Sequence, residues 1–227
     1  MKYGKIVEGK FISRPNRFVA HVEIDGKEEI VHVKNTGRCK ELLIEGARVF
    51  LEESSNPERK TKFDLVAVYK GDILVNIDSQ VPNKVALEFL KESGMFSSEA
   101  KFKPEYKIGA SRIDIFVSDG ERRALIEVKG VTLEREGVAM FPDAPTERGV
   151  KHINELIEAK KQGYESYILF VIQMKGIKSF TPNYETHKEF GEALKKAKDA
   201  GVKILAYDCI VGTDVLKIDK PITVDLG

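Results

Sequence analysis

Three residues near the middle of the chain have the types and spacing of a divalent-metal site. They are Asp114, in the segment SRIDIF, and Glu127 and Lys129, in the segment IEVKG. Glu127 and Lys129 are two residues apart, so on one β-strand their side chains share a face of the sheet. A turn over residues 118–121 would bring Asp114, on the preceding strand, beside Glu127 on that face.

Two carboxylates and an ammonium group on a half-buried pair of strands are costly unless something compensates their charges. A metal ion between Asp114 and Glu127 would do so, and we expect Mg²⁺ or Mn²⁺, because such ions take a few carboxylate oxygens and keep several waters. Lys129 would orient or deprotonate a water, or hold the attacked phosphate. The pattern is short, and two alternatives stay open: a salt bridge between Asp114 and Lys129, or an exposed sheet face.

The first 80 residues are expected to form a small β-barrel. Short apolar strands and turn residues alternate there, which is typical of an OB-like barrel with a short helix between its third and fourth strands. The strands are predicted over residues 5–12, 17–24, 29–33, 47–52, 63–69 and 73–77, and the helix over residues 39–44. Val81-Pro82-Asn83 breaks the pattern, so we place a domain boundary near residue 80.

Residues 81–227 alternate strands and helices, which predicts an α/β domain with a mixed sheet. A helix is expected from Asn83 to Gly94, a second from Thr146 to Lys161, and a third over residues 187–200. Strands are predicted over residues 106–108, 112–117, 122–128, 166–173 and 203–211, with a hairpin over residues 131–140. The strands over 166–173 and 203–211 are almost uninterruptedly apolar, as in the buried centre of a sheet.

Composition excludes several classes of protein. The net charge is only +1, so any nucleic-acid surface must come from local clustering of basic residues. Two distant cysteines, Cys39 and Cys209, exclude a CxxC zinc or redox motif. No apolar run is long enough to span a bilayer, and the first residues lack the features of a signal peptide. We therefore expect a cytoplasmic protein that does not interact with membranes.

The acidic constellation resembles the site of the PD-(D/E)xK nuclease superfamily, in which an Asp and a Glu-x-Lys on the next strand form the metal site. A carboxylate on the preceding helix often joins them there. The resemblance implies a metal site made by Asp114, Glu127 and Glu88, with Lys129 as a further catalytic residue.

Longer blocks resemble the sugar fermentation stimulation protein A (SfsA) family. They are RPNRFVA (14–20), HVKNTGRCKELL (32–43), GASRIDIF (109–116), EVKGVTL (127–133) and AMFPDAPTERGVKHINEL (139–156). They occur in the family's order and span most of the chain. The resemblance implies an N-terminal OB-like domain, a C-terminal nuclease-like domain and DNA as the partner. The family's name describes a phenotype and gives no reaction.

Two groups of residues are candidates for contacts with DNA. In the barrel they are basic side chains and a loop that could present N–H groups to a phosphate: Arg14, Arg17, Asn35, Thr36, Arg38 and Lys40. In the second half they lie at the start of a helix and one turn later: Thr146, Arg148 and His152. The alternatives are a solvated basic face, an ordinary helix cap and a buried histidine.

Two functions follow from these observations. The first is a Mg²⁺- or Mn²⁺-dependent DNA phosphodiesterase that uses Asp114, Glu127 and Lys129. The alternative is a non-catalytic DNA-binding regulator, of sugar-metabolism genes, that keeps the nuclease architecture. A sugar-metabolism enzyme would follow only from the family name, and no residues support it. The sequence does not decide between binding and cleavage.

Overall fold

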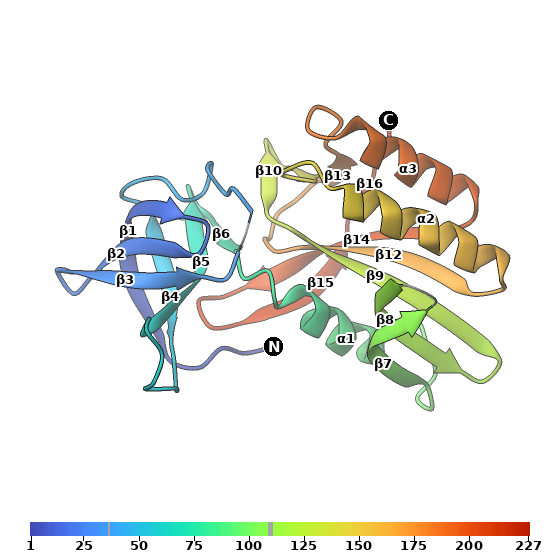
Figure 1. Ribbon diagram of the computed structural model, residues 1–227, viewed down its shortest axis with the longest axis horizontal. Helices are drawn as coiled ribbons and strands as arrows, with labels where there is room; N and C mark the ends of the chain where they lie inside the picture. Colours follow the sequence, from blue (N-terminus) through green and yellow to red (C-terminus); the bar gives the residue numbers. More distant parts are fainter. Residues whose placement is uncertain (36, 109–110) are drawn as a thin grey trace.

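The computed structural model describes residues 1–35, 37–108 and 111–227. Two parts lie side by side, a β-barrel built from the first strands and an α/β part that contains the helices α1, α2 and α3 (Figure 1). No helix in the described ranges is long and apolar enough to cross a membrane.

The barrel closes through a parallel pairing. Its sheet runs in the order β3-β2-β1-β4-β5-β6, and β3 also pairs with β5 through His32–Asp64 and Val33–Leu65. Five strands therefore form a closed, OB-like barrel, as predicted. The strands are β1 (Ile6–Asn16), β2 (Val19–Ile24), β3 (Lys27–Val33), β4 (Arg48–Glu53), β5 (Phe63–Lys70) and β6 (Ile73–Asn76).

The prediction of a helix over residues 39–44 is wrong. The segment makes one turn, in which the Leu43 N–H donates to the Cys39 carbonyl oxygen at 2.9 Å. Cys39 has a φ of 45°, in the left-handed region, and a right-handed helix cannot run through such a residue. The apolar spacing of Cys39 and Leu42 instead buries both side chains in the barrel core.

The α/β part is built on a mixed six-stranded sheet in the order β15-β14-β12-β9-β8-β7, as predicted. Its central strands β9, β12 and β14 are parallel, and β7, β8 and β15 are antiparallel to their neighbours. The strands are β7 (Lys101–Ile108), β8 (Ser111–Asp119), β9 (Arg122–Val131), β12 (Glu165–Ile172), β14 (Lys203–Val211) and β15 (Leu216–Pro221).

Helices cover both faces of this sheet (Figure 1). Helix α1 (Pro82–Glu92) packs on one face, and α2 (Glu147–Lys161) and α3 (Lys188–Asp199) pack on the other. A smaller sheet of β10 (Leu133–Arg135), β11 (Val138–Phe141), β13 (Ser179–Pro182) and β16 (Thr223–Val224) lies beside them. The sequence prediction missed β13, β15 and β16, and began β7 five residues late.

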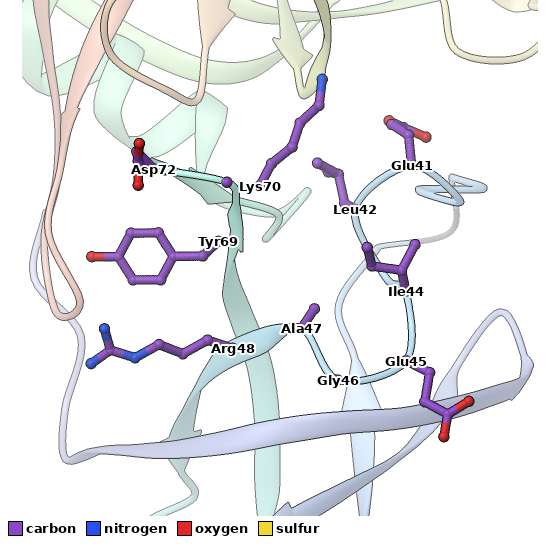
Figure 2. A pocket seen from close by; sticks show the side chains of 11 residues that line it. Glu41, Leu42, Ile44, Glu45, Gly46, Ala47, Arg48, Tyr69, Lys70 and Asp72 are labelled. Carbon is purple, nitrogen blue, oxygen red and sulfur yellow. The ribbon is translucent and has the colours of Figure 1, made fainter.

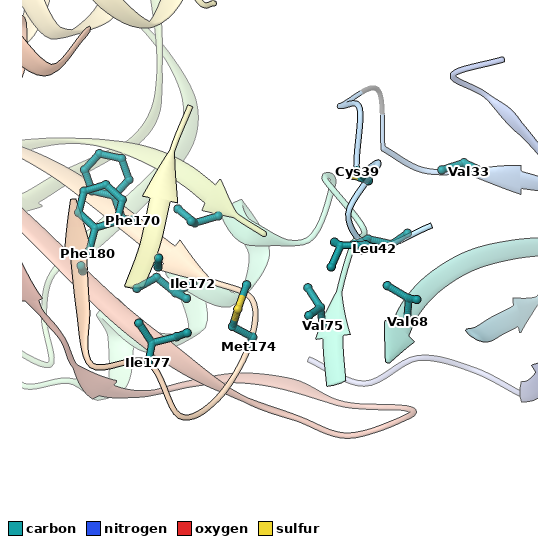
Figure 3. Close-up of a cluster of buried hydrophobic side chains, with 14 of the residues drawn as sticks. Val33, Cys39, Leu42, Val68, Val75, Phe170, Ile172, Met174, Ile177 and Phe180 are labelled. Carbon is teal, nitrogen blue, oxygen red and sulfur yellow. The ribbon is translucent and has the colours of Figure 1, made fainter. Parts of the chain in front are cut away.

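The two parts share one continuous apolar core. Leu42 and Val75 of the barrel lie close to Met174, which follows β12, and the same cluster extends to Phe170 and Phe180 (Figure 3). Polar contacts join the parts too. The Gln173 side chain donates to Asn76 Oδ1 at 2.8 Å, and the Asn76 N–H donates to the Gln173 carbonyl oxygen at 2.9 Å.

Barrel closure places the buried carboxylate of Asp64 among three cationic or imidazole groups. Arg59 binds it through both terminal nitrogens, at 2.7 and 2.8 Å, His32 lies at 2.9 Å, and Lys34 at 3.2 Å. Burial alone would raise the Asp64 pKa, but these hydrogen bonds and charges outweigh it and hold the pKa well below its usual range.

We predict that Asp64→Asn lowers the free energy of unfolding by about 2 kcal/mol at pH 7, because it removes the buried carboxylate that pairs with the partly buried Arg59 and Lys34. The depressed pKa means that the wild-type contribution is complete above about pH 4 and is lost as pH falls toward the folded-state value. Urea unfolding at several pH values measures both effects. Glu8→Gln is the control, because its partner Arg48 lies in an exposed pair. Equal stability of the two variants at pH 7 would contradict this role for Asp64.

Candidate functional site

The site begins where β8 separates from β9. Their antiparallel ladder ends at the pair Ile115–Ile126. One residue further, Asp114 Oδ2 accepts a hydrogen bond from the backbone N–H of Val128 at 2.7 Å. A side chain thus takes the position that the β8 backbone would otherwise fill, which satisfies the Val128 N–H and fixes the carboxylate between the strands.

Glu127 lies beside this carboxylate and is almost fully buried. Its Oε1 accepts a hydrogen bond from Lys129 Nζ at 2.6 Å and is also bonded to His152 Nδ1. Its Oε2 is buried and has no hydrogen-bond partner among the described residues. A buried carboxylate oxygen without a partner is costly, and a bound cation is one of the groups that would offset that cost.

The two carboxylates have opposite pKa shifts. Burial, and then the charge of Glu127, raise the pKa of Asp114 above its ordinary value. Burial would also raise the pKa of Glu127, but the His152 hydrogen bond and the charge of Lys129 outweigh it and lower the pKa. At neutral pH Glu127 is therefore held as an anion, while the charge on Asp114 costs folding free energy.

Glu88 does not join this site. It is half exposed, and its Oε2 accepts from the amino group of Met1 at 2.7 Å on the other side of α1. Asn83, in the first turn of the same helix, reaches the site instead and donates to Asp114 Oδ1 at 2.9 Å. Five residues of an α-helix turn through about 500°, so Asn83 and Glu88 point in different directions. No group of three or more His, Cys, Asp or Glu that could hold a metal occurs in the described ranges.

Helix α2 supplies the site's second wall. His152 is buried and bridges Glu127 to Arg148, whose Nε lies 3.3 Å from His152 Nε2. Thr146 is a helix cap, which was the alternative to its predicted contact with DNA. Its hydroxyl oxygen accepts a hydrogen bond from the Gly149 N–H at 3.0 Å. Arg148 is exposed, so its other nitrogens face solvent at the mouth of the site.

Two barrel candidates are structural and not available to DNA. The Arg14 guanidinium donates to the carbonyl oxygens of Asn35, Gly37, Arg38 and Arg17, and so holds the loop that follows β3. The Asn35 side chain is buried: it donates to the Ile77 carbonyl oxygen and accepts from the Gly37 N–H at 2.7 Å. That N–H is therefore already used. These two assignments as DNA-contacting residues are corrected.

Arg17, Arg38 and Lys40 remain as exposed basic groups on the barrel, and no ion pair to them occurs among the described residues. Arg17 lies over the exposed ring of Phe18, 5.7 Å from its centroid. Thr36 lies outside the described residues. A separate hollow on the barrel is lined by Arg48, Tyr69 and Lys70 (Figure 2), but Arg48 there stacks on Tyr69, and Lys70 pairs with Glu134 of β10 at 2.6 Å.

Gly130, the last residue of the EVKG segment, is required by close packing. A Cβ added there would lie 2.6 Å from Gln173 Oε1 and 2.7 Å from Pro82 Cγ. The start of α1 therefore rests directly on β9, which brings Asn83 within reach of Asp114. The sequence signal for Asn83 was its place next to Pro82 at a helix start, where Asn is common for reasons of capping alone.

Comparison with known proteins places the chain in a family. The model described as "Sugar fermentation stimulation protein RE domain" matches residues 80–214, and the "SfsA N-terminal OB domain" model matches residues 12–77. The chain belongs to the sugar fermentation stimulation protein A family.

Two curated relatives support this assignment, both called sugar fermentation stimulation protein homologs. One, from Clostridium beijerinckii, is 57% identical over 96% of each chain. The other, from Desulfitobacterium hafniense (strain Y51), is 58% identical over 100% of this chain and 99% of the relative. The solved structure of Pyrococcus furiosus SfsA in complex with Ca²⁺ covers 99% of this chain and 98% of its own, with a TM-score of 0.86 and 27% identity.

We predict that Asp114→Asn raises the melting temperature in EDTA by about 2–4 °C. The raised pKa of Asp114 means that its charged form is disfavoured in the folded protein, so a neutral amide removes that cost. The same variant should lose any increase in melting temperature caused by Mn²⁺. Thermal unfolding with EDTA and with Mn²⁺ measures both, and a variant less stable than wild type in EDTA would contradict the pKa assignment.

Proposed function

We propose that this chain is a divalent-metal-dependent DNA phosphodiesterase. The observation that carries the proposal is the buried Oε2 of Glu127, which has no hydrogen-bond partner in the part of the chain that the structure describes and belongs to a carboxylate next to Asp114 and Lys129. A family relative whose structure was determined in complex with Ca²⁺ gives independent support, because Ca²⁺ and Mg²⁺ both take oxygen ligands.

The residues present fit Mg²⁺ or Mn²⁺. Asp114 and Glu127 would hold the ion through carboxylate oxygens, and each oxygen of Asp114 keeps a lone pair beyond its one hydrogen bond. A bound ion would supply Lewis-acid stabilisation of the charge that develops on the phosphate. Two carboxylates of the described residues, Asp114 and Glu127, line the site, so waters would complete the shell, as is usual for Mg²⁺.

The chain's own residues have distinct tasks in hydrolysis of a phosphodiester. Water forms the new bond to phosphorus, and the leaving oxygen departs with a proton. Lys129 Nζ, held 2.6 Å from Glu127 Oε1, would orient the attacking water or neutralise a phosphate oxygen. His152 fixes the rotamer of Glu127, and the exposed Arg148 would bind a neighbouring phosphate.

A DNA-binding regulator without turnover is the second candidate. The observation that favours it is the position of Glu88, which leaves the site with one carboxylate fewer than the nuclease pattern. In this case Arg17, Arg38 and Lys40 would carry the function, and the acidic site would only organise the fold.

We predict Mn²⁺-dependent cleavage of DNA that Asp114→Ala, Glu127→Gln and Lys129→Met each reduce by at least about 100-fold. Lys129→Met should keep Mn²⁺ binding, because an ammonium group is no ligand. Incubation of the pure protein with labelled single- and double-stranded DNA tests this. Glu88→Gln is the matched control and should cleave like wild type. Cleavage that survives in Asp114→Ala would indicate a contaminant or another site and would contradict the proposal.

We also predict that affinity for DNA falls steeply with salt, since phosphate contacts release counterions. Arg38→Ala and Lys40→Ala should each lower the slope of log affinity against log salt by about one. Arg14→Ala should instead lower the melting temperature, because Arg14 holds the loop. Fluorescence anisotropy at several salt concentrations gives the slopes. An affinity for DNA that does not change with salt concentration would contradict both candidate functions.

A further inference from the structure

A polar cleft of about 330 Å³ lies between the barrel and the α/β part, next to the acidic site. Asn35, Gly37 and Ser79 form its barrel side. Its other side is formed by Gly130 and Thr132 at the end of β9, the segment 140–146 before α2, and Gln173 after β12. Gly130 directly follows Lys129, and Thr146 caps the helix that carries His152, so the cleft and the acidic site share β9 and α2.

The end of β9 has no partner among the described strands on the side where β8 pairs with its earlier residues. Backbone groups of every second residue point to the same side of a strand, so Gly130 N–H and C=O point the same way as the Val128 N–H that binds Asp114. On that side the ladder with β8 has already ended at Ile126, and no other described strand replaces it. Gly130, which lines the cleft, therefore has backbone N–H and C=O groups without a strand partner on that side among the described residues.

The cleft is too narrow for a double helix. A Cβ added to Gly37 would lie 2.5 Å from Asp143 Oδ2, so the two walls touch at that point. The major groove of DNA alone is about 12 Å wide. The cleft volume is at the lower end of the range for small-molecule sites, which suits one nucleoside rather than a duplex.

The chemistry of the lining suits a base and sugar better than a phosphate. No Lys or Arg is found among the described residues that line the cleft, and Asp143 contributes a carboxylate. The carboxylate of Asp143 and the hydroxyl group of Thr132 match the donors and acceptors on the edges of bases, whereas the side-chain nitrogen of Gln173 already donates to Asn76 and to the Asp78 carbonyl oxygen. Basic groups lie next to the lining segments in the chain, Arg38 after Gly37 and Arg148 two residues after Thr146, and both are exposed.

We propose that this cleft binds the base and sugar of one unpaired nucleotide, beside the phosphate that Asp114, Glu127 and Lys129 would engage. The proposal rests on the phosphodiesterase function and narrows its substrate to single strands, overhangs and unpaired ends. A nucleotide inside a duplex could place its base in this cleft only after it is extruded from the stack, which costs unpairing and stacking energy. A continuous closed duplex is therefore a poor substrate.

The test compares one sequence as a labelled single strand and within a covalently closed circular duplex, with Mn²⁺. Wild type should cleave the single strand at least tenfold faster. Thr132→Phe fills the cleft from the α/β side, and Ser79→Trp fills it from the barrel side. Each should weaken single-strand binding in EDTA, measured by anisotropy, at least tenfold and leave the Mn²⁺-induced rise in melting temperature unchanged. Thr213→Phe, at an exposed turn outside the cleft, is the matched control.

The outcomes separate the two proposals. Equal cleavage of closed duplex and single strand, or wild-type single-strand binding by both folded cleft variants, overturns the cleft proposal and leaves the phosphodiesterase standing. Wild-type protein that neither binds nor cleaves any of these DNAs overturns the phosphodiesterase and the cleft proposal together. Loss of binding in Thr213→Phe as well would show that the effect is not local to the cleft and would overturn the cleft proposal.

Discussion

The separation of β8 from β9 at Asp114 is the feature on which the site depends. A carboxylate takes the Val128 N–H in place of a backbone carbonyl, so the sheet opens without leaving that amide unpaired. The opening gives Asp114 and Glu127 one shared space, bounded by the first turn of α1 on one side and by α2 on the other. The end of β9 beyond this opening contributes Gly130 to the lining of the cleft between the two parts.

Charge compensation explains why the surrounding residues have their types. Glu127 is kept anionic by His152 and Lys129, whereas the hydrogen bonds that Asp114 accepts come from neutral donors, Asn83 and the Val128 amide, and these bonds together with the charge of Lys129 do not outweigh its burial and the charge of Glu127. Such an arrangement stores unfavourable free energy in the folded protein that a cation would relieve. A purely structural salt bridge would pair both carboxylates, and here one oxygen of Glu127 is left without a partner among the described residues.

Local patterns in the sequence predicted most of this architecture. The short apolar strands of the barrel with the turn residues between them, and the apolar runs of β12 and β14, indicated the strand positions, and the Thr146 cap indicated the start of α2. Asp114, Glu127 and Lys129 were identifiable because strand alternation determines which side chains share a face. The turn at residues 39–44 was missed because apolar spacing cannot reveal the left-handed φ of Cys39. Glu88 was predicted to reach the site from α1, but Asn83 reaches it instead. The sequence could not show this, because the rotation of α1 about its axis depends on the packing of Pro82 against Gly130.

The central claim is that Asp114 and Glu127 together hold a divalent cation. Anomalous scattering from a crystal soaked in Mn²⁺ tests it most directly, because it locates the ion without relying on activity. The account predicts one strong peak within coordination distance of both carboxylates, next to Lys129 and away from Glu88. A well-diffracting soaked crystal with no peak at this position, or with the ion bound at Glu88 instead, would contradict it.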